Sequence, residues 1–418
     1  MERKLLGGVF LFLGLLASCS GRQTETGELE TIRLATAFEN QTELKASDCF
    51  SQVHYVTLET SDSCLIGNDP LIQIASDRII VMTSHQQCFA FDKQTGKFLH
   101  SIGHVGDDPE ACREMYGWLN GSAEQLYFPS IDYRKMTVYD LDNRFIRKQP
   151  EVLTLPEGSI CPLEYDYWDK ETLLVHSYAT ETTPDCITFI RDTSVLSVFP
   201  TNSEPANEHT PRLGIDVDKF SIATEGTGGH KLYIILDDGK SSLVASENKS
   251  PFWHFGKDVF FKGNFNDTIY RVMPDGLHPE RLLDLGSYHW DVADRYYAHK
   301  DKGFYLLDFF ENGQIVLFRF CRNLYHEKER VAYNAVYNKR SGKVMVAPYD
   351  SGLINDLGSF LPLQPVTSNS EGEFAQLIQP GESVSWFEEH PEVRNLPDDV
   401  EQLRKVGEED NPVVVIMK

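Results

Sequence analysis

Titratable residues that could move protons or bind a metal lie around one expected hairpin, Cys88–Ile102. His85, His100 and His104 surround this hairpin, and Asp107-Asp108-Pro109-Glu110 follows it in a loop. Imidazoles can shuttle protons or bind metals, and carboxylate oxygens suit Ca²⁺. However, the acidic loop lacks the alternating spacing of an EF-hand-like loop, and closeness in sequence does not make side chains converge. We therefore expect ordinary loop and strand residues and no cofactor, with Ca²⁺ as an unsupported alternative.

Sequence motifs of established catalytic sites are missing. The sequence has no GxSxG nucleophile elbow, no P-loop, no GxGxxG and no sialidase-type Asp box. The segment His326–Arg330 begins like HExxH, but Arg330 stands where zinc needs a second histidine. We interpret it as an exposed run of charges. No residue is predicted to be catalytic or to bind a metal, which favours a protein that is not an enzyme.

Two aromatic triplets could form a contact surface. They are Trp253-His254-Phe255 and Tyr288-His289-Trp290. Aromatic side chains with a polar tip suit sugar or peptide ligands, but they fill cores equally well. We expect these triplets to lie in the core.

Composition excludes several classes of protein. The chain has 418 residues, of which 39 are basic and 63 acidic, giving a net charge of −24. A hydrophobic fraction of 41% argues against a mostly disordered chain. The acidic balance argues against a nucleic-acid binder, which needs a basic surface, and against a polybasic membrane-surface protein.

The N-terminus predicts export. Arg3 and Lys4 precede an uncharged apolar run, Leu5–Ala17, that is too short to span a bilayer comfortably and fits a secretory signal. The end of this run, Leu16-Ala17-Ser18-Cys19, resembles the bacterial lipobox. That resemblance implies cleavage between Ser18 and Cys19 and lipid attachment to the Cys19 thiol. An ordinary signal peptide with a chance cysteine is the alternative.

The residues after Cys19 indicate in which membrane the protein is expected. Ser20–Gln23 contains no Asp next to the cysteine and no acidic cluster. We therefore expect an envelope lipoprotein, anchored in the membrane by lipid at Cys19 and facing the periplasm from the outer membrane. Exposure at the cell surface stays an alternative.

Seven cysteines follow Cys19. They contain no CxxC pair, and an odd number leaves at least one thiol unpaired. We expect small buried apolar residues, while a Cys49–Cys64 bridge stays open.

Most of the remaining chain is expected to form short β-strands. A hairpin pattern recurs, in which an aromatic strand, a polar turn, often with Gly and a basic residue, and a second strand follow one another. Its anchors Phe91, Tyr139 and Phe189 lie 48 and 50 residues apart, which is the length of a four-stranded propeller blade. Tyr270 and Tyr337 are later anchors, and Lys231–Ser246 could hold a blade between Phe189 and Tyr270.

These blades predict an all-β fold, a six-bladed β-propeller, with seven blades or a large sandwich or solenoid as alternatives. Pro397–Lys405 is predicted to be a short C-terminal helix, because its acidic start and basic end suit the helix dipole. Residues 1–18 are the expected lipoprotein signal peptide, 19–45 a polar tether with a possible short strand, and 46–418 the propeller. The strand after Asp410 is expected to help close the ring.

Several segments resemble six-bladed β-propeller lipoproteins of Gram-negative bacteria that are related to NHL-repeat propellers. They are Cys49–Thr60, Phe91–Phe98, Ile102–Gly106, Asn266–Tyr270, Asp284–Gly286 and Asp410–Ile416. The glycine turn at Ile102–Gly106 departs from the family pattern after Gly106, so no role is carried over to that loop. The resemblance implies the fold and supplies no enzymatic residues.

Together these observations predict a lipid-anchored, non-catalytic binding or scaffold module. Its partner would be a protein, a peptide or a glycan, and not a nucleic acid. The alternative is a metal-dependent, lactonase-like propeller hydrolase whose ligands line the central channel.

Overall fold

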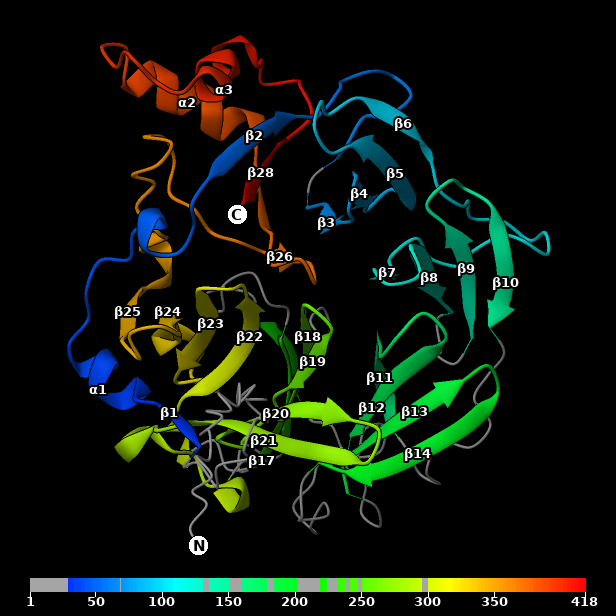
Figure 1. Ribbon diagram of the computed structural model, residues 1–418, viewed down its shortest axis with the longest axis vertical. Helices are drawn as coiled ribbons and strands as arrows, with labels where there is room; N and C mark the ends of the chain where they lie inside the picture. The colour runs from blue at the N-terminus through cyan, green and yellow to red at the C-terminus, as the bar shows by residue number, and fades with distance from the viewer. Residues whose placement is uncertain are drawn as a thin grey trace, which may run out of the picture.

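The fold was analysed in a computed structural model of the chain. It describes residues 29–67, 69–130, 135–149, 160–178, 184–201, 219–223, 232–237, 241–246, 250–294 and 300–418. In this part the strands form seven small sheets, six of which lie in a ring around a central channel (Figure 1). The prediction of an all-β, six-bladed propeller is confirmed.

The blades follow one another in chain order around the ring. Blade 1 contains β3 (Leu71–Ile74), β4 (Arg78–Thr83), β5 (Gln87–Asp92) and β6 (Phe98–Ser101). Blade 2 contains β7 (Trp118–Asn120), β8 (Gln125–Pro129), β9 (Met136–Asp140) and β10 (Phe145–Gln149). Blade 3 contains β11 (Ile160–Tyr167), β12 (Thr172–Tyr178), β13 (Cys186–Arg191) and β14 (Ser194–Pro200).

The second half of the ring continues this order. Blade 4 contains β18 (Phe252–Phe255), β19 (Asp258–Phe261), β20 (Thr268–Met273) and β21 (Gly276–Leu283). Blade 5 contains β22 (Tyr305–Glu311), β23 (Ile315–Arg322), β24 (Val331–Asn338) and β25 (Val344–Pro348). Blade 6 joins β26 (Thr367–Ser368), β27 (Phe374–Ile378) and β28 (Val413–Met417) to β2 (Val53–Thr57).

Apolar clusters between neighbouring blades hold the ring together. Each of the six junctions has its own buried cluster, represented by Val81 with Val414, Ile80 with Leu126, Val138 with Val175, Phe189 with Phe261, Phe260 with Phe318, and Leu317 with Val415. Burial of apolar surface is the main favourable term in folding. Because every blade lends both faces to such clusters, the ring closes without a free sheet face.

The seventh sheet corrects one detail of the sequence-based prediction. It contains β15 (Lys219–Ala223), β16 (Leu232–Asp237) and β17 (Ser241–Ser246), and thus the segment Lys231–Ser246 that was expected to be a blade. Phe189 of blade 3 and Phe261 of blade 4 share one cluster directly, so no blade separates them. The three-stranded sheet is an insertion between two blades, and the ring keeps six.

Blade 6 supplies the missing member of the ring and closes it. β28 lies between β2 and β27 and is antiparallel to both, so a strand from each end of the described chain meets in one sheet. All five residues of β28 are buried. The expectation that this strand helps to close the ring is therefore confirmed.

Residues 30–44 pack on the propeller, although the sequence predicts a tether for 19–45. β1 (Glu30–Ile32) adds a parallel fifth strand to blade 4 beside β21. It corresponds to the short strand that the sequence predicts as possible within the tether. α1 (Leu34–Glu39) follows, and Phe38 packs edge-on against Tyr288 and Phe304. Buried Ile32, Leu34 and Phe38 give the segment an apolar face that the tether interpretation missed.

Helical segments are few in the described part. α2 (Pro380–Glu389) and α3 (Asp398–Gln402) lie outside blade 6 (Figure 1). α3 continues into a 3₁₀ turn, Leu403–Lys405, which confirms the predicted C-terminal helix. Further 3₁₀ turns span Ala46–Asp48, Gly286–Tyr288, Val292–Asp294, Glu327–Glu329 and Tyr349–Ser351. None of the described helices is long and apolar enough to cross a membrane.

Six cysteines whose side chains are described are buried, and none of these six forms a disulfide. They are Cys49, Cys64, Cys88, Cys112, Cys186 and Cys321. Burial raises the pKa of the Cys49 thiol to about 12 and that of Cys112 to about 11, so these side chains stay protonated and unreactive. The prediction of small buried apolar residues is confirmed for these six, and the Cys49–Cys64 bridge is absent.

Candidate functional site

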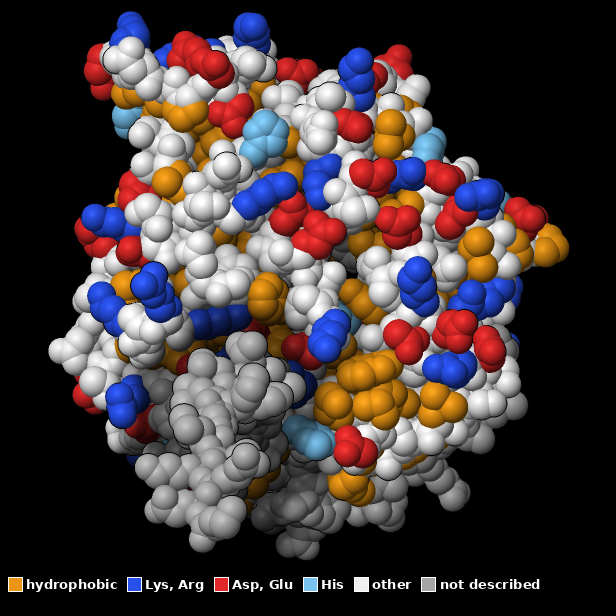
Figure 2. Space-filling model, in the orientation of Figure 1, with side chains coloured by type: hydrophobic (Ala, Val, Ile, Leu, Met, Phe, Trp, Pro, Cys, Tyr) orange, Lys and Arg blue, Asp and Glu red, His pale blue; other side chains and the backbone are white. Residues whose placement is uncertain are grey.

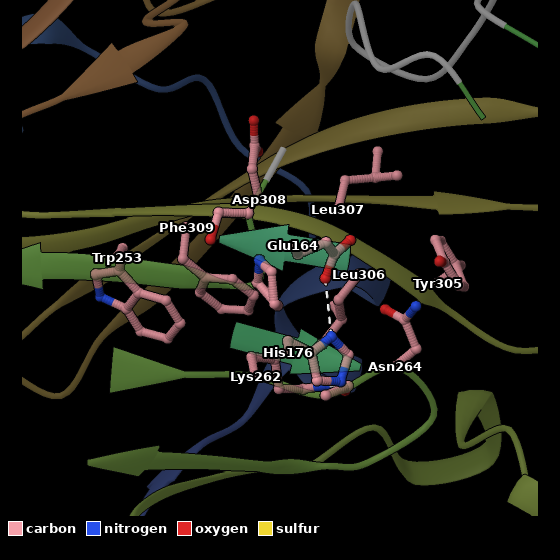
Figure 3. A pocket seen from close by; sticks show the side chains of 13 residues that line it. Glu164, His176, Trp253, Lys262, Asn264, Tyr305, Leu306, Leu307, Asp308 and Phe309 are labelled. Atoms are coloured by element: carbon pink, nitrogen blue, oxygen red, sulfur yellow. Dashed lines mark hydrogen bonds and ion pairs between the residues drawn. The ribbon is translucent and has the colours of Figure 1, made fainter. Parts of the chain in front are cut away.

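A small polar cavity opens on the channel side of blades 3, 4 and 5. Its volume, about 30 Å³, offers room for about two water molecules. Strand β22 supplies five of the lining residues, β11, β12 and β18 supply one each, and the segments before β18 and after β19 supply the other five (Figure 3). The lining residues are Glu164, His176, Ser250, Pro251, Trp253, Lys262, Gly263, Asn264, Tyr305, Leu306, Leu307, Asp308 and Phe309.

A buried ion pair forms one wall of this cavity. Glu164 on β11 lies directly opposite His176 on β12 in the strand register, and this register brings their side chains together. Glu164 Oε2 lies 2.8 Å from His176 Nδ1 (Figure 3). Burial acts to lower the pKa of His176, but the hydrogen bond and charge of Glu164 outweigh it, so the pKa is raised.

Lys262 brings a second buried cation to the cavity. The residue follows directly after β19 and is 7% exposed. Its ammonium group donates to the Gly263 carbonyl oxygen at 2.6 Å. Burial lowers the pKa of Lys262 to about 8, while the charge of Asp267 acts in the opposite direction. An ammonium group held by a carbonyl alone is costly to bury.

β22 contributes Tyr305 and Asp308 from an irregular stretch. Its register against β23 shifts between Leu306 and Phe309, and such bulges re-aim side chains near functional sites. Asp308 Oδ2 lies 3.2 Å from the buried Arg319 guanidinium. The Tyr305 hydroxyl is buried without a hydrogen-bond partner in the described part of the chain. Burial raises the pKa of Tyr305 well above its usual value, so the hydroxyl remains a donor.

The apolar side of the cavity is rigid. Trp253 stacks on Phe260 and Phe309, with ring centroids 5.5 and 4.7 Å apart. Its indole nitrogen donates to Glu311 at 2.9 Å, and Arg281 and Lys339 both pair with the same carboxylate. The cavity therefore has a fixed apolar wall, with paired charges behind it.

Charge pairing decides what the cavity can do chemically. The carboxylates of Glu164 and Asp308 each have a cationic partner, His176 and Arg319, whereas Lys262 makes no ion pair with a described residue. The balance favours holding a small polar or anionic group. In the described part, no group of three or more His, Cys, Asp or Glu side chains could hold a metal ion.

The histidines and acids that the sequence singled out lie elsewhere. His104 pairs with Asp108 at 2.7 Å on the surface, and Asp108 also accepts backbone hydrogen bonds from Glu110 and Ala111. His100 lies on β6 and contacts the neighbouring Ser101 carbonyl. The acidic loop thus caps its own turn, as expected for ordinary loop residues.

With one exception, the remaining sequence candidates behave as predicted where they are described. Glu327–Glu329 forms an exposed 3₁₀ turn. Arg330 departs from the predicted exposed run of charges, because it is buried and donates to the Leu324 carbonyl at 2.8 Å. Trp253 and Trp290 are 5% and 3% exposed, so both aromatic triplets contribute to the core. Ser18 and Cys19 lie outside the described residues, so their predicted cleavage and lipidation stay predictions.

Apart from Trp253, the residues that build the cavity were not singled out by sequence. They lie far apart in the chain, on three blades, and no short motif links them. The sequence contained one weak sign of a buried charge, which was Lys262 directly after the apolar run Val259–Phe261. The sign is weak because a lysine that ends an apolar strand is exposed in most proteins.

Comparison with known proteins supports the architecture. A family profile described as "Domain of unknown function (DUF4934)" matches residues 29–418. A solved structure from Bacteroides fragilis, named as a candidate exported protein, is 15% identical with a TM-score of 0.59 and covers 90% of this chain and 97% of its own. A DUF4221 family member from Bacteroides vulgatus is 9% identical with a TM-score of 0.42, over 90% and 98%. No curated protein matches the sequence.

Proposed function

The chain belongs to the family described as domain of unknown function DUF4934, and we propose that it is a binding module of the cell envelope. The observation that carries this proposal is the channel-side cavity, where three blades bring together buried polar groups around a rigid apolar wall. Concave sites with an apolar lining and a few fixed polar groups are typical of ligand binding. We interpret the site as binding without catalysis.

The cavity is small, so it would hold one group of a larger ligand. A side chain, a chain end or a sugar substituent could enter it, while the rest of the partner lies across the face of the propeller. Charged side chains of both signs are interspersed on the face seen in Figure 2. A mixed surface of this kind suits a protein, peptide or glycan partner better than a nucleic acid, whose phosphates need a basic one.

The proposed location is the outer membrane, with the propeller in the periplasm. This rests on the apolar run Leu5–Ala17 and on the lipobox-like Leu16–Cys19. The name of the similar Bacteroides fragilis protein, a candidate exported protein, agrees with export. Kinship with NHL-like propeller lipoproteins is part of the same proposal and rests on segments such as Phe91–Phe98 and Asn266–Tyr270.

A binding screen with cavity variants tests this function. The purified lipoprotein would be screened by thermal shift against peptides, glycans and small acids, and each hit would be measured by calorimetry. The same hits would then be measured with Lys262→Met and with Lys257→Met, which removes an exposed lysine from the β18–β19 turn of the same blade. Ligands that lose affinity only in the Lys262 variant support the proposal.

Two outcomes would contradict the proposed function. Hits that bind both variants as tightly as the wild type would place the binding site elsewhere. Conversion of a bound ligand into a product, seen by mass spectrometry and lost in Lys262→Met, would make the protein an enzyme.

A further inference from the structure

We propose that the channel-side cavity binds a carboxylate group of its ligand. This inference rests on the proposed function, because it names the chemistry recognised by the same site. Its basis is a pair of buried donors, the Lys262 ammonium group and the Tyr305 hydroxyl, that line one cavity and have capacity to spare.

Lys262 supplies the positive charge. An ammonium group has three donors, and among the described contacts one of them is used, on the Gly263 carbonyl. A second buried lysine, Lys93, shows the usual solution, because it pairs with Glu373 at 2.8 Å and donates to the Ala75 carbonyl. Lys262 has no such carboxylate among the described residues, so an anionic ligand would complete its surroundings.

Tyr305 supplies a neutral donor. It is 3% exposed, and its hydroxyl has no partner in the described part of the chain. A buried polar group without a hydrogen bond costs about 1–3 kcal/mol, so such groups call for an explanation. A ligand oxygen that accepts from Tyr305 provides one.

The charges around these donors select a monoanion. Glu164 and Asp308 line the same cavity and are paired with His176 and Arg319, whereas Lys262 has no carboxylate within ion-pair distance among the described residues. A dianionic phosphate would face two carboxylates across about 30 Å³ of space. A carboxylate carries the single negative charge that the one cation, Lys262, can neutralise, and its oxygens accept hydrogen bonds.

The carboxylate could belong to a free organic acid or to the end of a peptide chain. Leu306, Leu307 and Phe309 lie beside the donors, so either source would present an apolar group next to its carboxylate. Butyrate represents the first source. An N-acetylated dipeptide with an apolar last residue and a free carboxyl end represents the second.

The test compares each acid with its uncharged analogue. Binding to the purified lipoprotein would be measured by calorimetry for butyrate against butyramide, and for the free dipeptide against its C-terminal amide. Inorganic phosphate would serve as the dianion. We expect an acid to bind at least about tenfold more tightly than its amide, since hydrogen bonds to charged groups contribute about 1.5–3 kcal/mol.

Two variants attribute this preference to the cavity. Lys262→Met should abolish the preference for the acid, whereas Tyr305→Phe should weaken acid binding about tenfold without lowering the melting temperature, because its hydroxyl has no partner among the described residues. Lys257→Met, an equal change of charge on the surface of the same blade, should bind like the wild type. Binding of butyrate, of the peptide or of both supports the proposal and identifies the source.

Four results would overturn it. The amides could bind as tightly as the acids and still lose affinity in Lys262→Met, in which case the cavity binds a neutral ligand and the proposed function survives. All probes could fail to bind, or phosphate could bind best, and either would refute carboxylate recognition. Acid binding that no cavity variant changes would refute both the inference and the proposed site.

Discussion

Two buried lysines in one ring show how the environment decides the effect of a charge. Lys93 is neutralised by Glu373, which also pairs with Lys418 at 2.7 Å. Lys262 is as deeply buried but has only a carbonyl partner among the described residues. Removing Lys93 would leave the buried Glu373 with the half-exposed Lys418 as its remaining cation, whereas removing an unpartnered charge relieves a cost.

We therefore expect opposite effects from the same substitution. Lys93→Met should lower the free energy of unfolding by about 1.5–3 kcal/mol, because Glu373 loses one charged hydrogen bond but keeps Lys418. Lys262→Met should raise it by about 3 kcal/mol at pH 7, because burial lowers the pKa of Lys262 from 10.5 to about 8 and each pKa unit corresponds to about 1.4 kcal/mol. Urea unfolding at pH 7 measures both changes.

The pH dependence gives the control for Lys262. The folded state binds this proton less well than the unfolded state, so wild-type stability should rise as the pH increases from about 8 towards 10.5. The Lys262→Met variant should lack this rise, and the two proteins should converge. A variant less stable than the wild type at pH 7 would show that Lys262 stabilises the fold rather than serving a ligand.

Asp301 offers a second test at the residue scale. It is 5% exposed, and burial raises its pKa to about 6, although the backbone amide of Tyr325 donates to it at 2.7 Å. The charged form is therefore disfavoured in the folded state, and stability should fall as the pH rises from about 4 through 6. Asp301→Asn keeps an acceptor for Tyr325 and should be more stable than the wild type at pH 7.

Thermal unfolding at pH 4 and pH 7 checks this expectation. The wild type and the Asp301→Asn variant should have similar melting temperatures at pH 4, and the variant should be the more stable of the two at pH 7. An equal loss of stability at both pH values would mean that the carboxylate is needed for its shape or hydrogen bonds rather than tolerated as a charge.

Some side chains were predictable from sequence and others were not, for a physical reason. Trp253 and Trp290 were expected in the core because large aromatic residues bury much apolar surface. Glu164 and Asp308 reach the channel through irregular strand register, at Ile160–Glu164 and Leu306–Phe309. A shift of one residue moves a side chain to the other face of a strand, and one sequence does not show where such shifts occur.

At the scale of single elements, turn chemistry explains the repeated hairpins. Asp92 caps the β5–β6 turn by accepting from the Thr95 backbone at 2.8 Å, and Gly96 follows with a φ of 69°. Asn338 and Gly342 repeat this arrangement between β24 and β25. A Cβ on Gly96 would also lie 2.0 Å from the Thr57 carbonyl oxygen. These turns explain why a glycine followed by a basic residue, as in Gly96-Lys97 and Gly342-Lys343, correctly indicated a hairpin.

Helices were predicted unevenly. α3 was expected because acidic residues at its start favour a helix. α2 was missed, although Pro380 stands in its first turn and Gln379 and Glu382 form a capping box. Its interior contains Gly381 and two serines, which lower helix propensity. Packing of Trp386 and Phe387 on Phe360 supplies what propensity does not.

β28 provides the prediction at the element scale. It is the central strand that joins both ends of the chain, and its residues are buried. Deleting Asp410–Lys418 would remove both strand ladders and open the ring, so we expect the cooperative thermal transition to be lost or to move far down. Circular dichroism with a melting curve measures this outcome.

A smaller change in β28 distinguishes the loss of core packing from the opening of the ring. Ile416 is 2% exposed, and Ile416→Val should cost about 0.5–1.5 kcal/mol with the transition still cooperative. A deletion mutant that melts like the parent protein would mean that β28 is dispensable and that the other five blades hold the ring.

At the scale of the whole molecule, the number of blades was predictable but their assignment was not. The anchors Phe91, Tyr139 and Phe189 indicated the length of a blade. A further blade was then expected at Lys231–Ser246, between Phe189 and Tyr270, to reach six blades. The ring reaches six by joining Val53–Thr57 to Val413–Met417. Strands from opposite ends of a chain cannot show a repeat, so only the three-dimensional pairing reveals this blade.

Membrane attachment is the last prediction, and it concerns the entire protein. The chain has a net charge of −24, so anionic lipid headgroups would repel it. Attachment would therefore depend on the lipid proposed at Cys19. We expect Cys19→Ala to abolish incorporation of labelled palmitate and to leave the leader uncleaved, with both observed on a gel of labelled cells.

A second cysteine provides the matched control, because loss of a thiol as such must not produce the effect. Cys186 is buried on β13 and forms no disulfide, so Cys186→Ala should be labelled and processed like the wild type. Two alkyl chains are needed for stable anchoring, so the labelled and processed wild type should stay in the membrane fraction. Labelling that persists in Cys19→Ala would place the lipid elsewhere and would end the lipobox interpretation.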